Sequence, residues 1–189
     1  MIRIALAAFA LVMASCGSRN LPALIGAARS GRTDLIATLV KQGADPNQRA
    51  GVNGWTPLMH AIHKNQKGSV AALLDAGADI DYRGADGSTP LMMAAGYGYT
   101  DIVNLLLDRG ADPRLQTNDG SNALTYAVLG ANDMDRFTVT DCQGPTIKAL
   151  VTRAPGLKLQ ASPAALKSAA VFKIKSCAGV AALLGTKYP

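Results

Sequence analysis

The sequence has few aromatic residues and no cluster of cations, and each shortage narrows the class of protein. Phe, Trp and Tyr make up 5% of 189 residues, and Ala, Leu and Gly are plentiful. This composition suits close-packed helices better than a sheet sandwich. The formal net charge is +6, but Lys and Arg form no run that would track a phosphate backbone. We therefore expect no nucleic-acid partner. The apolar share of 49% argues against a disordered chain.

Catalytic motifs are also missing. The sequence contains no G-x-x-x-x-G-K-[ST] loop, no G-x-S-x-G elbow and no C-x-x-C pair. Its two histidines, His60 and His63, are three residues apart, which puts them on one face of a helix. A weak metal site is one interpretation, but no carboxylate or cysteine lies near them on that helix to complete a tetrahedral set. We favour a solvated or partner-contacting pair, and we expect no enzyme activity and no cofactor.

Residues 1–15 are predicted to be an export signal. Arg3 precedes an apolar run over residues 4–13, which is too short to span a bilayer. The letters M-A-S-C that end at Cys16 resemble the bacterial lipobox, although Met13 stands where Leu is commonest. Gly17 resembles the pattern for outer-membrane sorting. The resemblance implies a periplasmic lipoprotein anchored to the outer membrane through Cys16. The alternative is an ordinary secretory signal, cut near Ala14 or Ser15, that leaves a soluble protein.

Export also changes what the three cysteines imply. The mature chain would enter an oxidising compartment, where disulfides persist. If Cys16 is lipidated, Cys142 and Cys177 remain as an even pair. A bridge between them would stabilise the C-terminal end of the chain. Two free, partly buried thiols are the alternative.

The strongest pattern is an internal repeat. The letters T-P-L at 56–58 recur at 89–91, and G-A-D at 77–79 recurs at 110–112, after an earlier copy at 43–45. The spacing is 33 or 34 residues throughout, and buried-type Ala and Leu positions keep the same register. Thr then caps a helix that Pro begins, and Gly leaves the second helix in a left-handed conformation.

These letters resemble the ankyrin-repeat family. Its pattern D-G-x-T-P-L, A-A-x-x-G and L-L-x-x-G-A-D is matched almost throughout by residues 86–112. The resemblance implies an all-α solenoid of about five helix-turn-helix units with β-hairpin-like loops, folded as one domain over residues 16–189. In repeat four, Asn122 and Ala123 replace Thr-Pro. The expected repeats are about 20–52, 53–85, 86–118 and 119–156, the last with an insertion at 132–144, followed by a degenerate capping unit at 157–189.

The resemblance also implies a binding surface, made of the loop tips and the exposed side of each first helix. Trp, Tyr, Met and Arg dominate interface energies when they occupy such a surface. Trp55, the only tryptophan, either anchors a partner or packs against the loop at 49–52. The slots predicted to be free are Arg49, Trp55, His60, His63, Tyr82, Arg83, Ser88, Met93, Tyr97, Gln116, Ser121 and Thr125.

We therefore expect a monomeric, non-catalytic module that holds a protein partner at the periplasmic face of a membrane. It would scaffold or inhibit that partner, as an immunity-type protein or as a support for a stress-defence enzyme. A structural envelope protein is the alternative. A metal carrier or enzyme built on His60 and His63 is the third and least favoured class.

Overall fold

The computed structural model describes residues 21–51, 53–130 and 143–160, which form short helices. Within these ranges no β-strand forms, and the β-type backbone pairing is limited to one isolated antiparallel bridge between Ala50 and Trp55. The predicted all-α class is therefore confirmed. Residues 21–30 are helical, and they are followed by α2 (Thr33–Lys41), α3 (Pro57–His63), α4 (Lys67–Asp75), α5 (Pro90–Gly96), α6 (Thr100–Asp108), α7 (Ala123–Leu129) and α8 (Gly144–Arg153).

The first helices of repeats two, three and four, which are α3, α5 and α7, each begin with a capping side chain. The hydroxyl of Thr56 accepts a hydrogen bond from the backbone N–H of Met59, and Thr89 caps α5 in the same way. A proline follows each threonine at the helix start, where its missing N–H costs nothing. Asn122 replaces the threonine at α7, and its side chain accepts from Thr125 N. The predicted caps are confirmed.

Left-handed glycines end the second helices. Gly43, Gly77 and Gly110 have φ angles of 90°, 88° and 91°. After Gly77, the N–H of Ala78 donates to the carbonyl of Leu73 at 2.9 Å, and equivalent bonds follow the other two glycines. This bonding satisfies carbonyls that the helix end leaves unpaired. The chain then turns into a long loop, as predicted.

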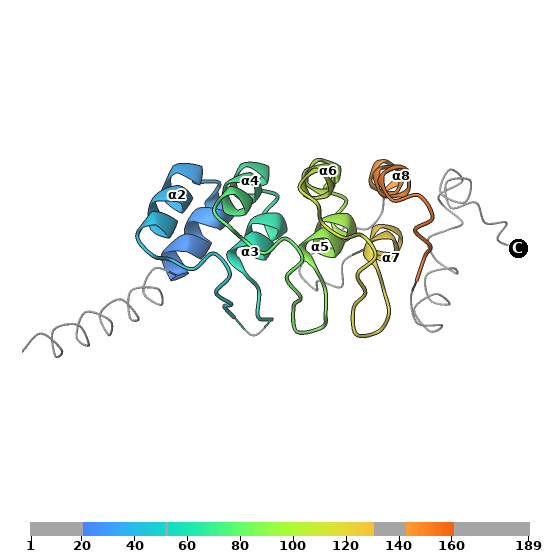
Figure 1. Ribbon diagram of the computed structural model, residues 1–189, viewed down its shortest axis with the longest axis horizontal. Coiled ribbons are helices and arrows are strands. Elements are labelled where there is room, and N and C mark those ends of the chain that lie inside the picture. The colour runs from blue at the N-terminus through green and yellow to red at the C-terminus, as the bar shows by residue number, and fades with distance from the viewer. Residues whose placement is uncertain (1–20, 52, 131–142, 161–189) are drawn as a thin grey trace, which may run out of the picture. The chain divides into compact units, whose positions relative to one another are not determined.

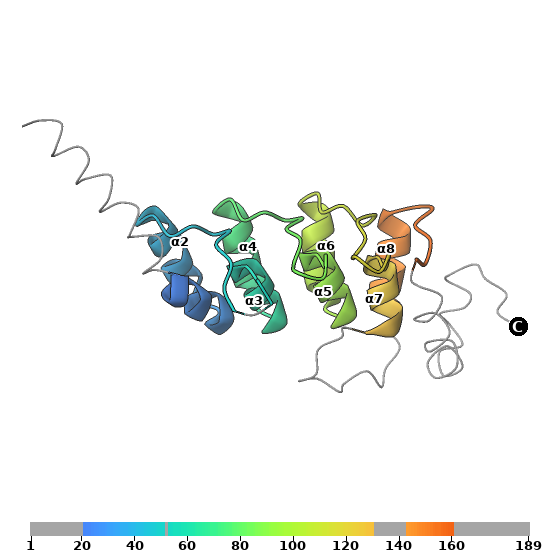
Figure 2. The same cartoon turned by 90° about the horizontal axis from the view of Figure 1, so that it is seen from below.

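The chain divides into two compact units, Met1–Asp79 and Ile80–Pro189. In the first unit α4 packs against both α2 and α3. In the second unit α5 packs against α6 and α7, and α8 packs against α6 and α7. There α5 and α7 form one layer and α6 and α8 the other (Figures 1 and 2). Within each unit, helix pairs stack on one another as the repeat pattern predicts.

Small residues and alternate leucines fill the space between the helices. Ala61 and Ala94 are fully buried, as expected where helices approach closely. The adjacent leucines of the second helices behave differently from each other. Leu73 and Leu106 are fully buried, whereas the following Leu74 and Leu107 are partly exposed. Only the first leucine of each pair therefore belongs fully to the core.

Several predictions concern residues outside the described ranges. These are the signal at 1–15, the three cysteines Cys16, Cys142 and Cys177, and most of the capping unit at 157–189. The insertion predicted at 132–144 also lies largely outside, but its last residue, Gly144, begins α8. Among the helices of the described residues, none has the length and apolar character needed to cross a membrane.

Candidate partner-binding surface

The first unit brings three predicted binding residues together. The ring centroid of Trp55 lies 5.5 Å from that of His60, edge to face, and 5.3 Å from that of His63. All three side chains are partly exposed. We call Trp55, His60 and His63 the aromatic cluster. It joins the end of one loop to the helix that follows, so a rigid apolar surface faces solvent at this point.

A tight hairpin positions Trp55. The N–H of Ala50 donates to the carbonyl of Trp55 at 3.0 Å, and Gly51 and Gly54 supply the positive φ angles that the reversal needs. Arg49 is exposed on the same hairpin, with its Cδ 3.9 Å from the position that a Cβ would take on Gly54. The tryptophan thus pairs with the loop through its backbone, while its ring packs on the two histidines.

His60 is held in its neutral form. Burial, followed by the Coulombic effects of Arg29, His63 and Lys64, lowers its pKa from 6.5 to about 4. Its Nε2 atom is buried and has no hydrogen-bond partner in the described structure. A neutral imidazole can stack on the indole without the solvation that an imidazolium would require. As for metal binding, the described residues contain no group of three or more potential ligands placed to hold an ion.

The predicted binding residues of the second unit also make contacts with other residues of the same unit. Arg83 and Gln116 are exposed, but Arg83 Nη2 donates to the Gln116 carbonyl at 2.6 Å. Tyr82 and Tyr97 are partly exposed, and the Tyr97 ring stacks on that of Tyr99 with centroids 5.4 Å apart. These side chains therefore stabilise the loops of this unit, and part of each remains exposed to solvent.

Four predicted surface residues of the second unit are buried, so the expectation that they are exposed is wrong. Ser88 is 7% exposed because its N–H and hydroxyl both donate to Asp86 Oδ1 in a tight turn. Met93 is 6% exposed, in a helix whose residues are all buried. Thr125 is fully buried, and its hydroxyl bonds to Asn122. Ser121, also predicted to be free, is 5% exposed.

The loop tips of the second unit carry acidic side chains. The N–H of Asn118 donates to the Asp86 carbonyl at 2.9 Å, which joins the two loops of this unit. The Thr117 hydroxyl, followed by the Ser121 backbone, stabilises the Asp119 carboxylate and lowers its pKa. Burial, followed by the charges of Asp86 and Asp119, raises the pKa of the neighbouring Tyr126 to about 12. Both acids therefore lie close enough to Tyr126 to act on its phenol.

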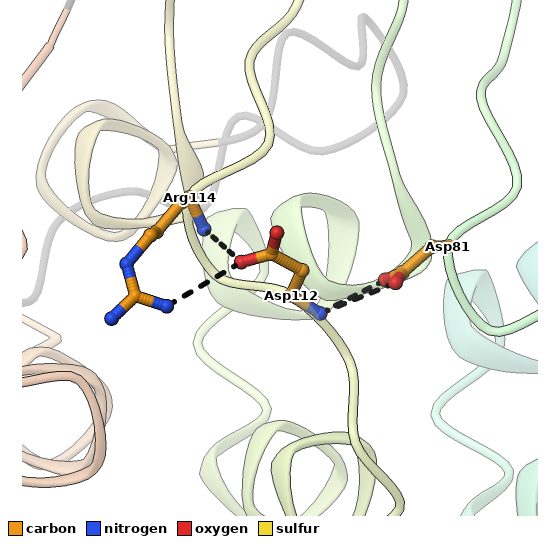
Figure 3. A network of polar contacts seen from close by, with 3 residues as sticks. All are labelled: Asp81, Asp112 and Arg114. Carbon is orange, nitrogen blue, oxygen red and sulfur yellow. Dashed lines mark hydrogen bonds and ion pairs between the residues drawn. The ribbon is translucent and has the colours of Figure 1, made fainter.

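A second set of bonds, which sequence reasoning missed, links the loops where the second helices end. Asn47 accepts from Asp79 N at 2.6 Å and donates to the Gly77 carbonyl at 3.1 Å. In the second unit the carboxylate of Asp81 accepts from Asp112 N at 3.0 Å, as Figure 3 shows. Asn47 and Asp81 each stand two residues after the Asp of a G-A-D motif. This repeated position is the sequence pattern from which the loop-to-loop bonds could have been predicted.

In the third G-A-D motif, the position two residues after the Asp is occupied by Arg114, and there the loop-to-loop hydrogen bonds end. An arginine side chain has no hydrogen-bond acceptor, so it cannot accept a bond from a backbone N–H of the next loop. Instead its own N–H donates to Asp112 Oδ1 at 2.9 Å, and its guanidinium lies 3.9 Å from the same oxygen (Figure 3). The loop-to-loop bonding through this position therefore stops at Asp112.

Residues 157–160 of the chain cover the start of α7. Asn122 Nδ2 donates to the Lys158 carbonyl at 2.8 Å, and Asn122 N donates to the Gln160 carbonyl at 3.3 Å. The Thr125 hydroxyl also bonds to the Gln160 carbonyl, and Gln116 Nε2 donates to Gln160 Oε1 at 2.7 Å. Two residues predicted to meet a partner, Gln116 and Thr125, thus contact the chain's own segment. Asn122 accepts from Thr125 N through Oδ1 and donates to Lys158 O through Nδ2, whereas a threonine hydroxyl has one oxygen to serve both bonds.

Comparisons with known proteins agree with this geometry. Two family models match the chain: one described as ankyrin repeats (many copies) over residues 73–127, and one described as ankyrin repeats (3 copies) over residues 6–84. The chain is 42% identical over 60 residues to the ankyrin repeat and SAM domain-containing protein 6 of Rattus norvegicus, which covers 32% of this chain and 7% of the relative. It is 49% identical over 53 residues to the ankyrin repeat protein nuc-2 of Neurospora crassa, covering 28% of this chain and 5% of the relative. The chain thus spans less than about a tenth of the length of these curated relatives.

Proposed function

The chain is an ankyrin-repeat protein, and from this we propose that it binds one protein partner at the periplasmic face of a bacterial membrane. Ankyrin repeats are protein-interaction modules and are generally non-catalytic. In this proposal the chain scaffolds or inhibits its partner, either as an immunity-type protein or as a support for a stress-defence enzyme. Cys16 carries the lipid anchor.

One observation carries the proposal. The aromatic cluster and Arg49 lie at a loop end and on a first helix, and they are partly or fully exposed. Trp and Arg are the residue types that most often dominate the energy of a protein interface. The bonds from Asn47 to the neighbouring loop fix the backbone beside this surface, so little ordering entropy remains to be lost on binding.

Partner capture tests the binding part of the proposal. We would express the full chain with its signal, cross-link intact cells and identify proteins recovered with it from the envelope. Trp55→Ala should lose a specific protein that the wild type recovers, while folding is checked by circular dichroism. Lys67→Ala is the matched control, because Lys67 is an exposed lysine on α4 that belongs neither to the hairpin nor to the aromatic cluster. No specific protein with the wild type, or an unchanged set with Trp55→Ala, would count against the proposal. Recovery of cell-wall material alone would favour the structural envelope role.

Membrane fractionation tests the anchor. The wild type should sediment with the membrane, and Cys16→Ser should move it to the soluble periplasmic fraction. External protease, added after the outer membrane is permeabilised, should digest both forms. A Cys16→Ser chain that stays with the membrane contradicts lipidation, and a protected chain contradicts the periplasmic location.

A further inference from the structure

Cationic side chains lie close to the aromatic cluster. Arg29 and Lys64 are near enough to His60 to lower its pKa by Coulombic repulsion. Arg49 adds a further exposed guanidinium on the hairpin that carries Trp55. The ion pairs found among the described residues involve none of Arg29, Arg49 and Lys64. The cluster therefore lies beside three cations, Arg29, Arg49 and Lys64, that form no ion pair within the described residues.

Such a surface has a stability cost when nothing covers it. The cations repel one another, and the unpaired Nε2 of His60 is buried without a hydrogen bond. An anion placed beside Arg29 and Arg49 relieves the repulsion and makes charge-assisted hydrogen bonds with the guanidinium groups. The exposed part of the indole then packs against apolar atoms next to that anion.

We propose that the aromatic cluster, together with Arg29 and Arg49, binds an acidic segment of the partner protein. This inference rests on the proposed function, since it specifies the chemistry of the same partner. Carboxylate side chains would meet the two arginines, and an adjacent apolar side chain would cover Trp55. A nucleic acid fits less well, because the cations surround one cluster and do not follow an extended stripe.

The single tryptophan makes the test specific to this site. Trp55 is the only tryptophan of the chain, so its fluorescence reports on the cluster alone. We would titrate the purified mature chain with an oligoglutamate peptide, with an oligolysine peptide of equal length, and with a single-stranded oligonucleotide. Oligoglutamate should give a saturable change in fluorescence that weakens as salt is added. Oligolysine should give none.

Variants separate the site from general charge attraction. Arg29→Ala and Arg49→Ala should each weaken oligoglutamate binding about two- to fivefold, as expected for an exposed ion pair. Lys67→Ala removes the same charge from α4 and should leave the affinity unchanged. Equal losses for all three variants, no response to oligoglutamate at low salt, or a stronger response to the oligonucleotide would overturn the inference.

The outcome is distinguishable from failure of the proposed function. If the wild type recovers a protein from the envelope and Arg29→Ala with Arg49→Ala still recovers it, only the acidic-segment inference fails. If the wild type recovers no protein, the proposed function itself fails, whatever the peptide result.

Discussion

Replacing Asn122 by Ala should destabilise the second unit by about 2 kcal/mol. The side chain is fully buried and its hydrogen bonds are of two kinds. Its Oδ1 accepts from Thr125 N at 3.0 Å, as the cap, and from the Thr125 hydroxyl. Its Nδ2 donates to Lys158 O at 2.8 Å and to Gln160 Oε1 at 3.3 Å. Loss of a cap costs about 1 kcal/mol. Loss of the donor bond to Lys158 O costs about as much again, which is the usual net contribution of one hydrogen bond.

Asn122→Thr separates the two contributions. Threonine caps α3 and α5 in this chain, so it should keep the bond to Thr125 and lose only the donor to Lys158. We expect a loss of about 1 kcal/mol, half that of Asn122→Ala. Urea unfolding followed by circular dichroism measures both losses, and hydrogen exchange at the Thr125 amide reports whether the cap persists. The reasoning is refuted if Asn122→Thr is as stable as the wild type, or as unstable as Asn122→Ala.

Three further changes test other parts of the structure. Ser69→Ala should raise the free energy of unfolding by about 1 kcal/mol, because the buried Ser69 hydroxyl has no hydrogen-bond partner; a lower urea midpoint would contradict this. Gly110→Ala and Gly87→Ala should each cost about 1 kcal/mol for a side chain at positive φ. Gly87→Ala should cost clearly more in the same urea assay, since its Cβ would lie 3.0 Å from Asn118 N while that of Gly110 meets nothing within 4 Å; equal losses would be inconsistent with the geometry. Because the folded-state pKa of His60 is lowered from 6.5 to about 4, its contribution to stability is present above pH 6.5 and is lost as the pH falls toward 4. Urea midpoints measured across that window should fall less steeply for His60→Gln, and parallel curves would rule out this role.

Much of the fold could be predicted because it depends on local backbone chemistry. Thr56 and Thr89 cap helices through atoms three residues away, and Gly77 and Gly110 adopt the conformation that other residues avoid. The positions of these residues in the sequence therefore predict where the helices begin and end. No distant contact is needed to place them.

The binding surface was harder to predict because burial depends on distant contacts. The repeat register assigns Ser88 and Thr125 to an outward face, but it does not show that a turn or the segment at 157–160 covers them. The rings of Trp55, His60 and His63 do lie together, and all three residues stand within nine residues of one another in the sequence. The cationic contribution of Arg29 comes from the preceding repeat, and the sequence alone gave no reason to choose it.

The bonds through Asn47 and Asp81 bear on how such an array can grow by duplication. Residues 53–85 contain both a donor and an acceptor for this type of bond. The N–H of Asp79 donates to the preceding loop, and the carboxylate of Asp81 accepts from the following loop. A tandem copy of this stretch would therefore supply the junction bond to its own neighbour. Residues 86–118 offer the amide of Asp112 but carry Arg114 where the acceptor is needed. Copies of that stretch would meet at a junction without the bond, so lengthening of the array by duplication is favoured ahead of residue 86 and disfavoured after it.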